Sequence, residues 1–206
     1  MNVNTVLMIF ESMYYQLDRQ LVSFIKEHRS IQKITPNFVT VLHLASIVPV
    51  IVLFQNQQLT QAFLVYLIAW PLDLLDGALA RATKKETELG AFLDPLVDKL
   101  IFLVPLAIFF EGTVDQFFVW ALILVEGSLV ITRIFKMIDS LATGEKADLK
   151  ANISGKLKCN LEIIGILLLF LSQIANTYVL VRVANAVLGF ALLMAVSSLS
   201  KHIIKR

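Results

Sequence analysis

Residues 34–72 read ITPNFVTVLHLASIVPVIVLFQNQQLTQAFLVYLIAWPL and contain no Asp, Glu, Lys or Arg. An α-helix needs about 20 mostly apolar residues to cross a bilayer, so this stretch is too long for one crossing and long enough for two. The polar run Gln55-Asn56-Gln57-Gln58 divides it near its middle. We therefore predict two membrane-spanning helices, at about 37–54 and about 60–82.

The composition of the whole chain agrees with a polytopic membrane protein. Of its 206 residues 57% are hydrophobic and 17% are charged, against about 25% charged in a soluble domain. This excludes a disordered chain, a basic nucleic-acid-binding domain and an ordinary soluble enzyme, and the single cysteine excludes a disulfide framework. Further spans are predicted at about 90–110, 116–137, 154–175 and 178–203, with a break at Glu111-Gly112-Thr113. The fold class is therefore all-α, with six spans in one domain over 35–206.

Residues 1–34 form a separate, amphipathic segment. Apolar residues recur there at helical spacing, with charged residues between them: Phe10, Met13, Tyr14, Leu17, Leu21, Phe24 and Ile25. The segment is too charged to cross the membrane, so we expect a helix that lies along the membrane surface. A soluble helix docked on the bundle is an equally good interpretation.

Lys and Arg collect on one side of the six-span arrangement. Sixteen of the 18 basic residues precede the first span, follow the sixth, or lie near the loops after the second and fourth spans. Arg182 lies on the opposite side, and Lys99 lies inside the third span. Because Lys and Arg accumulate in cytoplasmic loops, this asymmetry predicts that both termini are cytoplasmic.

Four aspartates flank the predicted cytoplasmic turn between the second and third spans. Asp73 and Asp76 are three residues apart and share one helix face, and Asp94 and Asp98, four apart, share another. Carboxylates brought together there must be neutralised by protons or cations. An all-oxygen site suits Mg²⁺ or Mn²⁺, and two ions about 3.5–4 Å apart can clamp a diphosphate.

The small residues in the same segments have two interpretations. Gly77 lies one turn past Asp73, and Gly90 lies one turn before Asp94. They either let a bulky ligand approach the acids closely or serve ordinary helix packing. The aspartates themselves favour function, since carboxylates inside membrane spans are costly.

The full spacing, D-x2-D-G-x2-A-R-x8-G-x3-D-x3-D over residues 73–98, resembles the signature of the CDP-alcohol phosphotransferase family. Thr35-Pro36-Asn37-Phe38-Val39-Thr40 resembles the start of that family's first span. Residues 92–99 and 155–158 resemble the branch that makes phosphatidylglycerophosphate.

This resemblance implies an enzyme of phospholipid synthesis. It would transfer the phosphatidyl group of CDP-diacylglycerol to the hydroxyl of a small polar acceptor and release CMP. The resemblance gives metal binding to Asp73, Asp76, Asp94 and Asp98, general-base catalysis to Asp98, and nucleotide or substrate contacts to Gly77, Ala80, Arg81, Gly90, Asn37 and Thr40. It further implies two Mg²⁺ or Mn²⁺ ions, contact with membrane lipids, a homodimer in a bacterial inner membrane, and no nucleic-acid partner.

The acceptor is less well defined by the sequence. Four basic residues lie at the cytoplasmic ends of the fourth and fifth spans: Arg133, Lys136, Lys156 and Lys158. They bind either the phosphate of an acceptor such as glycerol 3-phosphate or anionic lipid headgroups. His43 and the run Glu126-Gly127-Ser128 depart from the glycerophosphate branch, so inositol phosphate, serine and phosphatidylglycerol stay open as acceptors.

Three internal polar residues have unsettled roles. Glu126 and Glu162 either pair with a Lys or Arg in the bundle or line the acceptor pocket. His43 is better read as a hydrogen-bonded packing residue than as a ligand.

Other functions fit the pattern less well. A divalent-cation or proton transporter would place its acids near mid-membrane and show an internal repeat, whereas these acids gather at one end and no repeat is visible. An enzyme acting on isoprenyl diphosphates would show more closely spaced aspartates. An inactive scaffold would not need all four.

Overall fold

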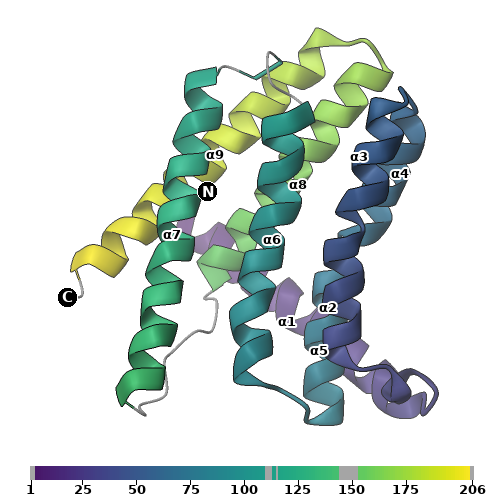
Figure 1. The fold of residues 1–206 in the computed structure, drawn as a ribbon, viewed down its shortest axis with the longest axis vertical. Helices are drawn as coiled ribbons and strands as arrows, with labels where there is room; N and C mark the ends of the chain where they lie inside the picture. The colour runs from purple at the N-terminus through teal and green to yellow at the C-terminus, as the bar shows by residue number, and fades with distance from the viewer. Residues whose placement is uncertain (1–2, 110–112, 115, 144–152, 205–206) are drawn as a thin grey trace.

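The computed structural model describes residues 3–109, 113–114, 116–143 and 153–204, and the protein is a helical bundle (Figure 1). The elements are α1 (Val3–Glu27), the 3₁₀ turn η1 (Ile31–Lys33), α2 (Pro36–Ala45), α3 (Ile47–Gln55), α4 (Leu59–Ala69), α5 (Leu72–Thr83), α6 (Glu88–Phe109), α7 (Gln116–Thr143), α8 (Ile153–Ile174) and α9 (Tyr178–Ile204). The all-α fold is as predicted.

The first two predicted spans are each interrupted, and this differs from the continuous helices that we expected. Pro49 has no N–H to bond the carbonyl of Ala45, and α2 ends at Ala45. Pro71 has the same effect at the junction of α4 and α5. A proline alone does not predict such a break, because Pro95 and Pro105 lie inside the continuous helix α6. The predicted polar turn between α3 and α4 lies where expected, at 56–58.

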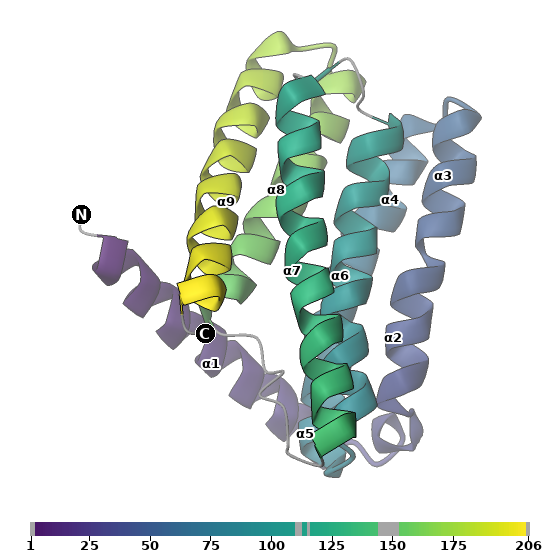
Figure 2. The same cartoon turned by 60° about the vertical axis from the view of Figure 1, so that its left-hand side comes forward.

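Five stretches of the described chain are long and apolar enough to cross a membrane: Pro36–Gln55, Leu59–Thr83, Gln116–Ser140, Leu157–Ile174 and Tyr178–Leu199. The remaining bundle helix, α6, is 22 residues long but carries Asp94, Asp98 and Lys99 within it. It runs alongside the others (Figures 1 and 2). The structure therefore contains helices that can cross a membrane, as predicted, while the count of six spans stays a prediction.

Three segments that lie next to predicted cytoplasmic basic residues are found at the same end of the bundle. The start of α2, the α5–α6 turn and the end of α7 lie at one end of the bundle (Figure 2). Helix α7 continues to Thr143, beyond the predicted end at about 137. Most of the predicted break at 111–113 and the loop positions Lys146 and Lys150 lie outside the described residues. Which membrane side this end faces stays a prediction.

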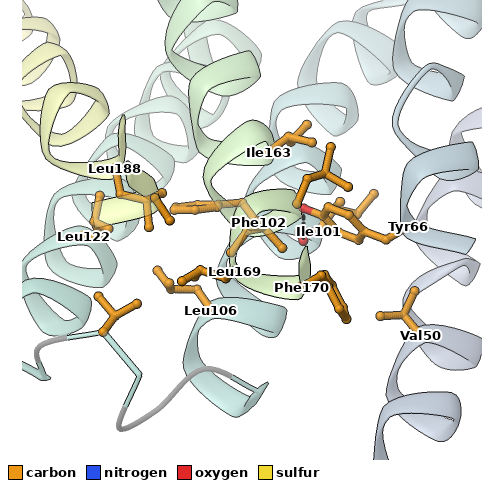
Figure 3. Close-up of a cluster of buried hydrophobic side chains, with 14 of the residues drawn as sticks. Val50, Tyr66, Ile101, Phe102, Leu106, Leu122, Ile163, Leu169, Phe170 and Leu188 are labelled. Carbon is orange, nitrogen blue, oxygen red and sulfur yellow. Dashed lines mark hydrogen bonds between the residues drawn. The ribbon is translucent and has the colours of Figure 1, made fainter. Parts of the chain in front are cut away.

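The apolar core lies between α3, α4, α6, α7, α8 and α9, around Phe102, Tyr66 and Phe170 (Figure 3). The Tyr66 hydroxyl donates to the Ile101 carbonyl at 3.3 Å, which ties α4 to α6. Helices α8 and α9 approach closely at Gly165, where a Cβ atom would lie 2.5 Å from the Leu188 side chain. The Tyr66 hydrogen bond and the burial of Ile101, Phe102 and Leu106 hold α6 against the bundle, and α6 carries half of the acid motif.

Helix α1 runs obliquely beside the end of the bundle at which α5 ends (Figure 2). Its Ile25 is buried with Val39, Ala78 and Leu79 of α2 and α5. A second apolar stripe, with Met13, Leu17 and Phe24 among its members, is exposed. The structure therefore shows the bundle contact that we considered, and contact of α1 with a membrane stays a prediction.

Candidate functional site

Electrostatic interactions link the four aspartates of α5 and α6. Asp98 lies within electrostatic range of Asp73, Asp76 and Asp94, and Asp76 lies within range of Asp73 and Asp94. Asp73 is eleven residues before the α5 cap at Lys84, and Asp98 is ten residues after the start of α6. At about 1.5 Å per residue, these two carboxylates lie roughly 15 Å below the turn. The two acids farthest from the turn are thus Asp73 of α5 and Asp98 of α6.

Asp76 is the most enclosed of the four acids. Only 3% of it is exposed, and its Oδ2 accepts a 2.7 Å hydrogen bond from Thr40 Oγ1 of α2. Its Oδ1 is buried and has no hydrogen-bond partner among the described residues. A buried carboxylate oxygen without a partner is costly, so this atom is a strong candidate for binding a cation.

The donor set fits a divalent metal by its chemistry. The motif supplies only carboxylate oxygens, which Mg²⁺ and Mn²⁺ prefer, and one of these oxygens is buried without a partner. Among the described residues, no three Asp, Glu, His or Cys side chains already converge on one point. Binding of an ion by three of these carboxylates therefore requires their side chains to rotate.

The predicted nucleotide-contact residues lie around these acids. A Cβ atom at Gly77 would be 3.1 Å from Nη1 of Arg81, so the arginine folds back over the glycine one turn before it. A Cβ atom at Gly90 would be 4.0 Å from Oδ1 of Asn37, which brings the start of α2 beside the start of α6. Ala80 is half-buried on α5. The structure thus places α2, α5 and α6 around one site.

Helix α1 also reaches this site, which sequence reasoning did not predict. Asp18 of α1 forms an ion pair with Arg81. One turn earlier, Tyr14 is near enough to Asp73 and Asp98 for their charges to act on its hydroxyl. Burial and then the charge of Asp73 raise the pKa of Tyr14 to about 12, so the phenol stays protonated and can donate a hydrogen bond at neutral pH. The only available signal was that positions 14, 18, 21 and 25 share a helix face.

A buried group of four charges lies next to the site. We call it the ion quartet: Lys99 of α6, Glu126 of α7, and Lys158 and Glu162 of α8. Lys99 Nζ is 2.7 Å from Glu126 Oε2 and 3.0 Å from Glu162 Oε2. Lys158 Nζ is 2.6 Å from Glu126 Oε1 and 3.7 Å from Glu162 Oε1. The quartet is electrically balanced and ties three helices together immediately after Asp98.

The quartet shows the partners of the two internal glutamates. Both Glu126 and Glu162 pair with lysines inside the bundle, which is one of the two roles that the sequence left open. His43 is buried, as expected for a packing residue, but its Nε2 has no hydrogen-bond partner among the described residues. The burial expected of a packing residue is therefore found, and no hydrogen bond is found at Nε2.

The four basic acceptor candidates have different surroundings. Arg133 is half-buried on α7, seven residues past Glu126 and so on the same face, while Lys136 is exposed. The side chain of Lys156 lies outside the described residues. Lys158 is in the quartet, so its positive charge is matched by Glu126 inside the bundle.

Known proteins resemble this chain over most of its length. The sequence model of the CDP-alcohol phosphatidyltransferase family matches residues 33–197, which contain α2 to α8 and most of α9. No solved structure matches the chain.

Relatives of the chain are named CDP-diacylglycerol–glycerol-3-phosphate 3-phosphatidyltransferase. The Haemophilus influenzae protein is 31% identical over 50% of this chain and 55% of its own length. The Pseudomonas fluorescens protein is 42% identical over 35% of this chain and 39% of its own length. The match to the Wigglesworthia glossinidia brevipalpis protein is longer, at 26% identity over 82% of this chain and 86% of that protein. The first two alignments thus span about half or less of those relatives.

The signature between residues 73 and 98, the acid site built from α2, α5 and α6, and the long family match agree with one another. The chain belongs to the CDP-alcohol phosphatidyltransferase family.

Proposed function

We propose that the chain transfers the phosphatidyl group of CDP-diacylglycerol to glycerol 3-phosphate and releases CMP. The observation that carries this proposal is the set of four aspartates on the α5–α6 hairpin, in a chain that matches the family over residues 33–197. The choice of glycerol 3-phosphate rests on the names of the relatives. Inositol phosphate, serine and phosphatidylglycerol are the alternative acceptors to be tested.

Asp73, Asp76, Asp94 and Asp98 would hold Mg²⁺ or Mn²⁺, two ions in the family-based interpretation. When bound, such ions supply positive charge that neutralises the diphosphate and stabilises the charge developing at phosphorus. Thr40 holds Asp76 from the α2 side, which orients this carboxylate. The protein would thus contribute carboxylate ligands, of which Asp76 is buried and oriented by Thr40.

Asp98 would accept the proton of the attacking acceptor hydroxyl. The hydroxyl oxygen forms a bond to the β-phosphorus of CDP-diacylglycerol, the bond from that phosphorus to the CMP oxygen breaks, and CMP leaves. Asp98 suits this role because it lies deep in the hairpin beside the other three acids. The charge asymmetry further supports a cytoplasmic site in a bacterial inner membrane, and we propose a homodimer by analogy with the family.

The proposal is tested by CMP release from CDP-diacylglycerol by purified protein with Mg²⁺ or Mn²⁺. The acceptor panel contains glycerol 3-phosphate, serine, inositol, inositol phosphate and phosphatidylglycerol. We expect turnover with glycerol 3-phosphate above every other acceptor, and no turnover with a chelator present. If no acceptor led to release of CMP, the result would contradict the proposed enzymatic activity and favour the alternative of a divalent-cation or proton transporter.

Replacing Arg133 with alanine tests the acceptor site. Arginine binds phosphate through paired hydrogen bonds, and Arg133 lies half-buried on the inner face of α7. We expect Arg133→Ala to raise KM for glycerol 3-phosphate about 10-fold, with KM for CDP-diacylglycerol nearly unchanged. The exposed Arg29 provides a control, Arg29→Ala. An unchanged acceptor KM would remove Arg133 from the site.

A further inference from the structure

The inner face of α1 is fixed to α5 by apolar packing. Leu21, Val22 and Ile25 pack against the cluster that contains Ala78 and Leu79. Asp18 lies one turn before Val22, so it is carried to the C-terminal part of α5 by this packing. The apolar packing of α1 on α5 therefore fixes the position of Asp18.

Asp18 and Arg81 meet where water is partly excluded. The side chain of Asp18 is 13% exposed and that of Arg81 is 35% exposed, and Asp18 Oδ1 accepts from Arg81 Nη2. The guanidinium also rests on Gly77, which leaves space for it by lacking a Cβ. Two contacts, one on each side, thus restrict a side chain that otherwise has many rotamers.

The remaining donors of Arg81 are not used up by these contacts. Its Nε is buried and has no hydrogen-bond partner among the described residues. The guanidinium borders a cavity of ≈ 420 Å³ between α1 and α5, lined also by Arg19 and Lys26. Three cations and the single anion Asp18 leave this cavity positive, as a phosphate-bearing ligand requires.

We propose that Asp18 is a positioning residue, which holds the Arg81 guanidinium so that its free donors bind the diphosphate of the nucleotide substrate. Asp18 acts through Arg81 and does not touch the substrate. Helix α1 is then part of the substrate site as well as a segment beside the bundle. This inference rests on the proposed function for the identity of the ligand, a cytidine diphosphate.

The test measures binding of CDP to the full-length protein in detergent with Mg²⁺, by calorimetry, so that it does not depend on turnover. We expect Asp18→Asn to weaken CDP binding about 10-fold, since the guanidinium loses a charged hydrogen bond that fixes it. Asp18→Glu retains the charge and should restore most of the affinity. Glu27→Gln, an exposed acid on the same helix, is the matched control and should bind as wild type does.

The charge-swapped protein Asp18→Arg/Arg81→Asp separates positioning from simple attachment of α1. The swapped protein can re-form the ion pair and so restore the melting temperature. It has no arginine at position 81, however, so its binding of CDP should stay weak. Recovery of CDP binding in the swap, unchanged binding in Asp18→Asn, or no CDP binding by wild type would each overturn the inference. A wild type that binds CDP but releases no CMP with any acceptor would contradict the proposed function alone.

Discussion

Replacement of Asp98 with asparagine is expected to lower the rate of CMP release by about 10³-fold, while CDP-diacylglycerol still binds. Asparagine has nearly the same shape but cannot take a proton from the acceptor hydroxyl. The rate is measured with saturating glycerol 3-phosphate, and lipid binding is measured separately on the same preparation.

Asp139→Asn is the control, because Asp139 is exposed near the end of α7. Equal losses of turnover and lipid binding would argue that Asp98 serves only as a ligand. If Asp98→Asn kept a rate within a few-fold of wild type, the general base would have to be another residue.

Replacement of Lys158 with methionine is expected to destabilise the protein by about 3–5 kcal/mol, because it leaves a buried excess of negative charge. Glu126 would lose the ammonium that lies 2.6 Å from its Oε1, and Lys99 would face two glutamates alone. The effect is measured by thermal unfolding in detergent. The exposed Lys85 provides the control, Lys85→Met.

The double variant Lys158→Met/Glu126→Gln removes one charge of each sign and leaves the Lys99–Glu162 pair, 3.0 Å apart. We expect it to recover most of the lost stability, because the buried quartet is stable only when its positive and negative charges balance. A double variant as unstable as Lys158→Met would show that the individual hydrogen bonds matter more than the balance.

The positions of the helices could be predicted because each span is marked by the residues next to one another in the sequence. An apolar run of sufficient length and a polar turn such as 56–58 are properties of neighbouring residues. The interruption near Pro49 is different, since a proline bends or breaks a helix according to how neighbouring helices satisfy the freed carbonyl. Pro49 marks where a break can occur, and the tertiary packing decides whether it does, since Pro95 and Pro105 leave α6 continuous.

The candidate site divides in the same way. The spacing of the four aspartates is local, so their electrostatic proximity on α5 and α6 could be predicted. Asp18 is 63 residues from Arg81 in the sequence, and its acidic side chain in an amphipathic helix looks like any solvated charge. The pairing of Glu126 was correctly foreseen as an option, but its lysines lie 27 and 32 residues away, beyond any helical periodicity.

The interruptions in the first two spans separate the chemistry from the fit to the bilayer. Helix α2 packs on α5 and α3 packs on α4, so the two broken spans form a hairpin with an acid-bearing half and an apolar half. The apolar half has no Asp, Glu, Lys or Arg between Ile47 and Ala69. A substitution that alters the hydrophobic length of the apolar half therefore falls outside the segments that carry Asp73 and Asp76. Under the proposed function, hydrophobic matching and phosphate chemistry belong to different halves of the same hairpin.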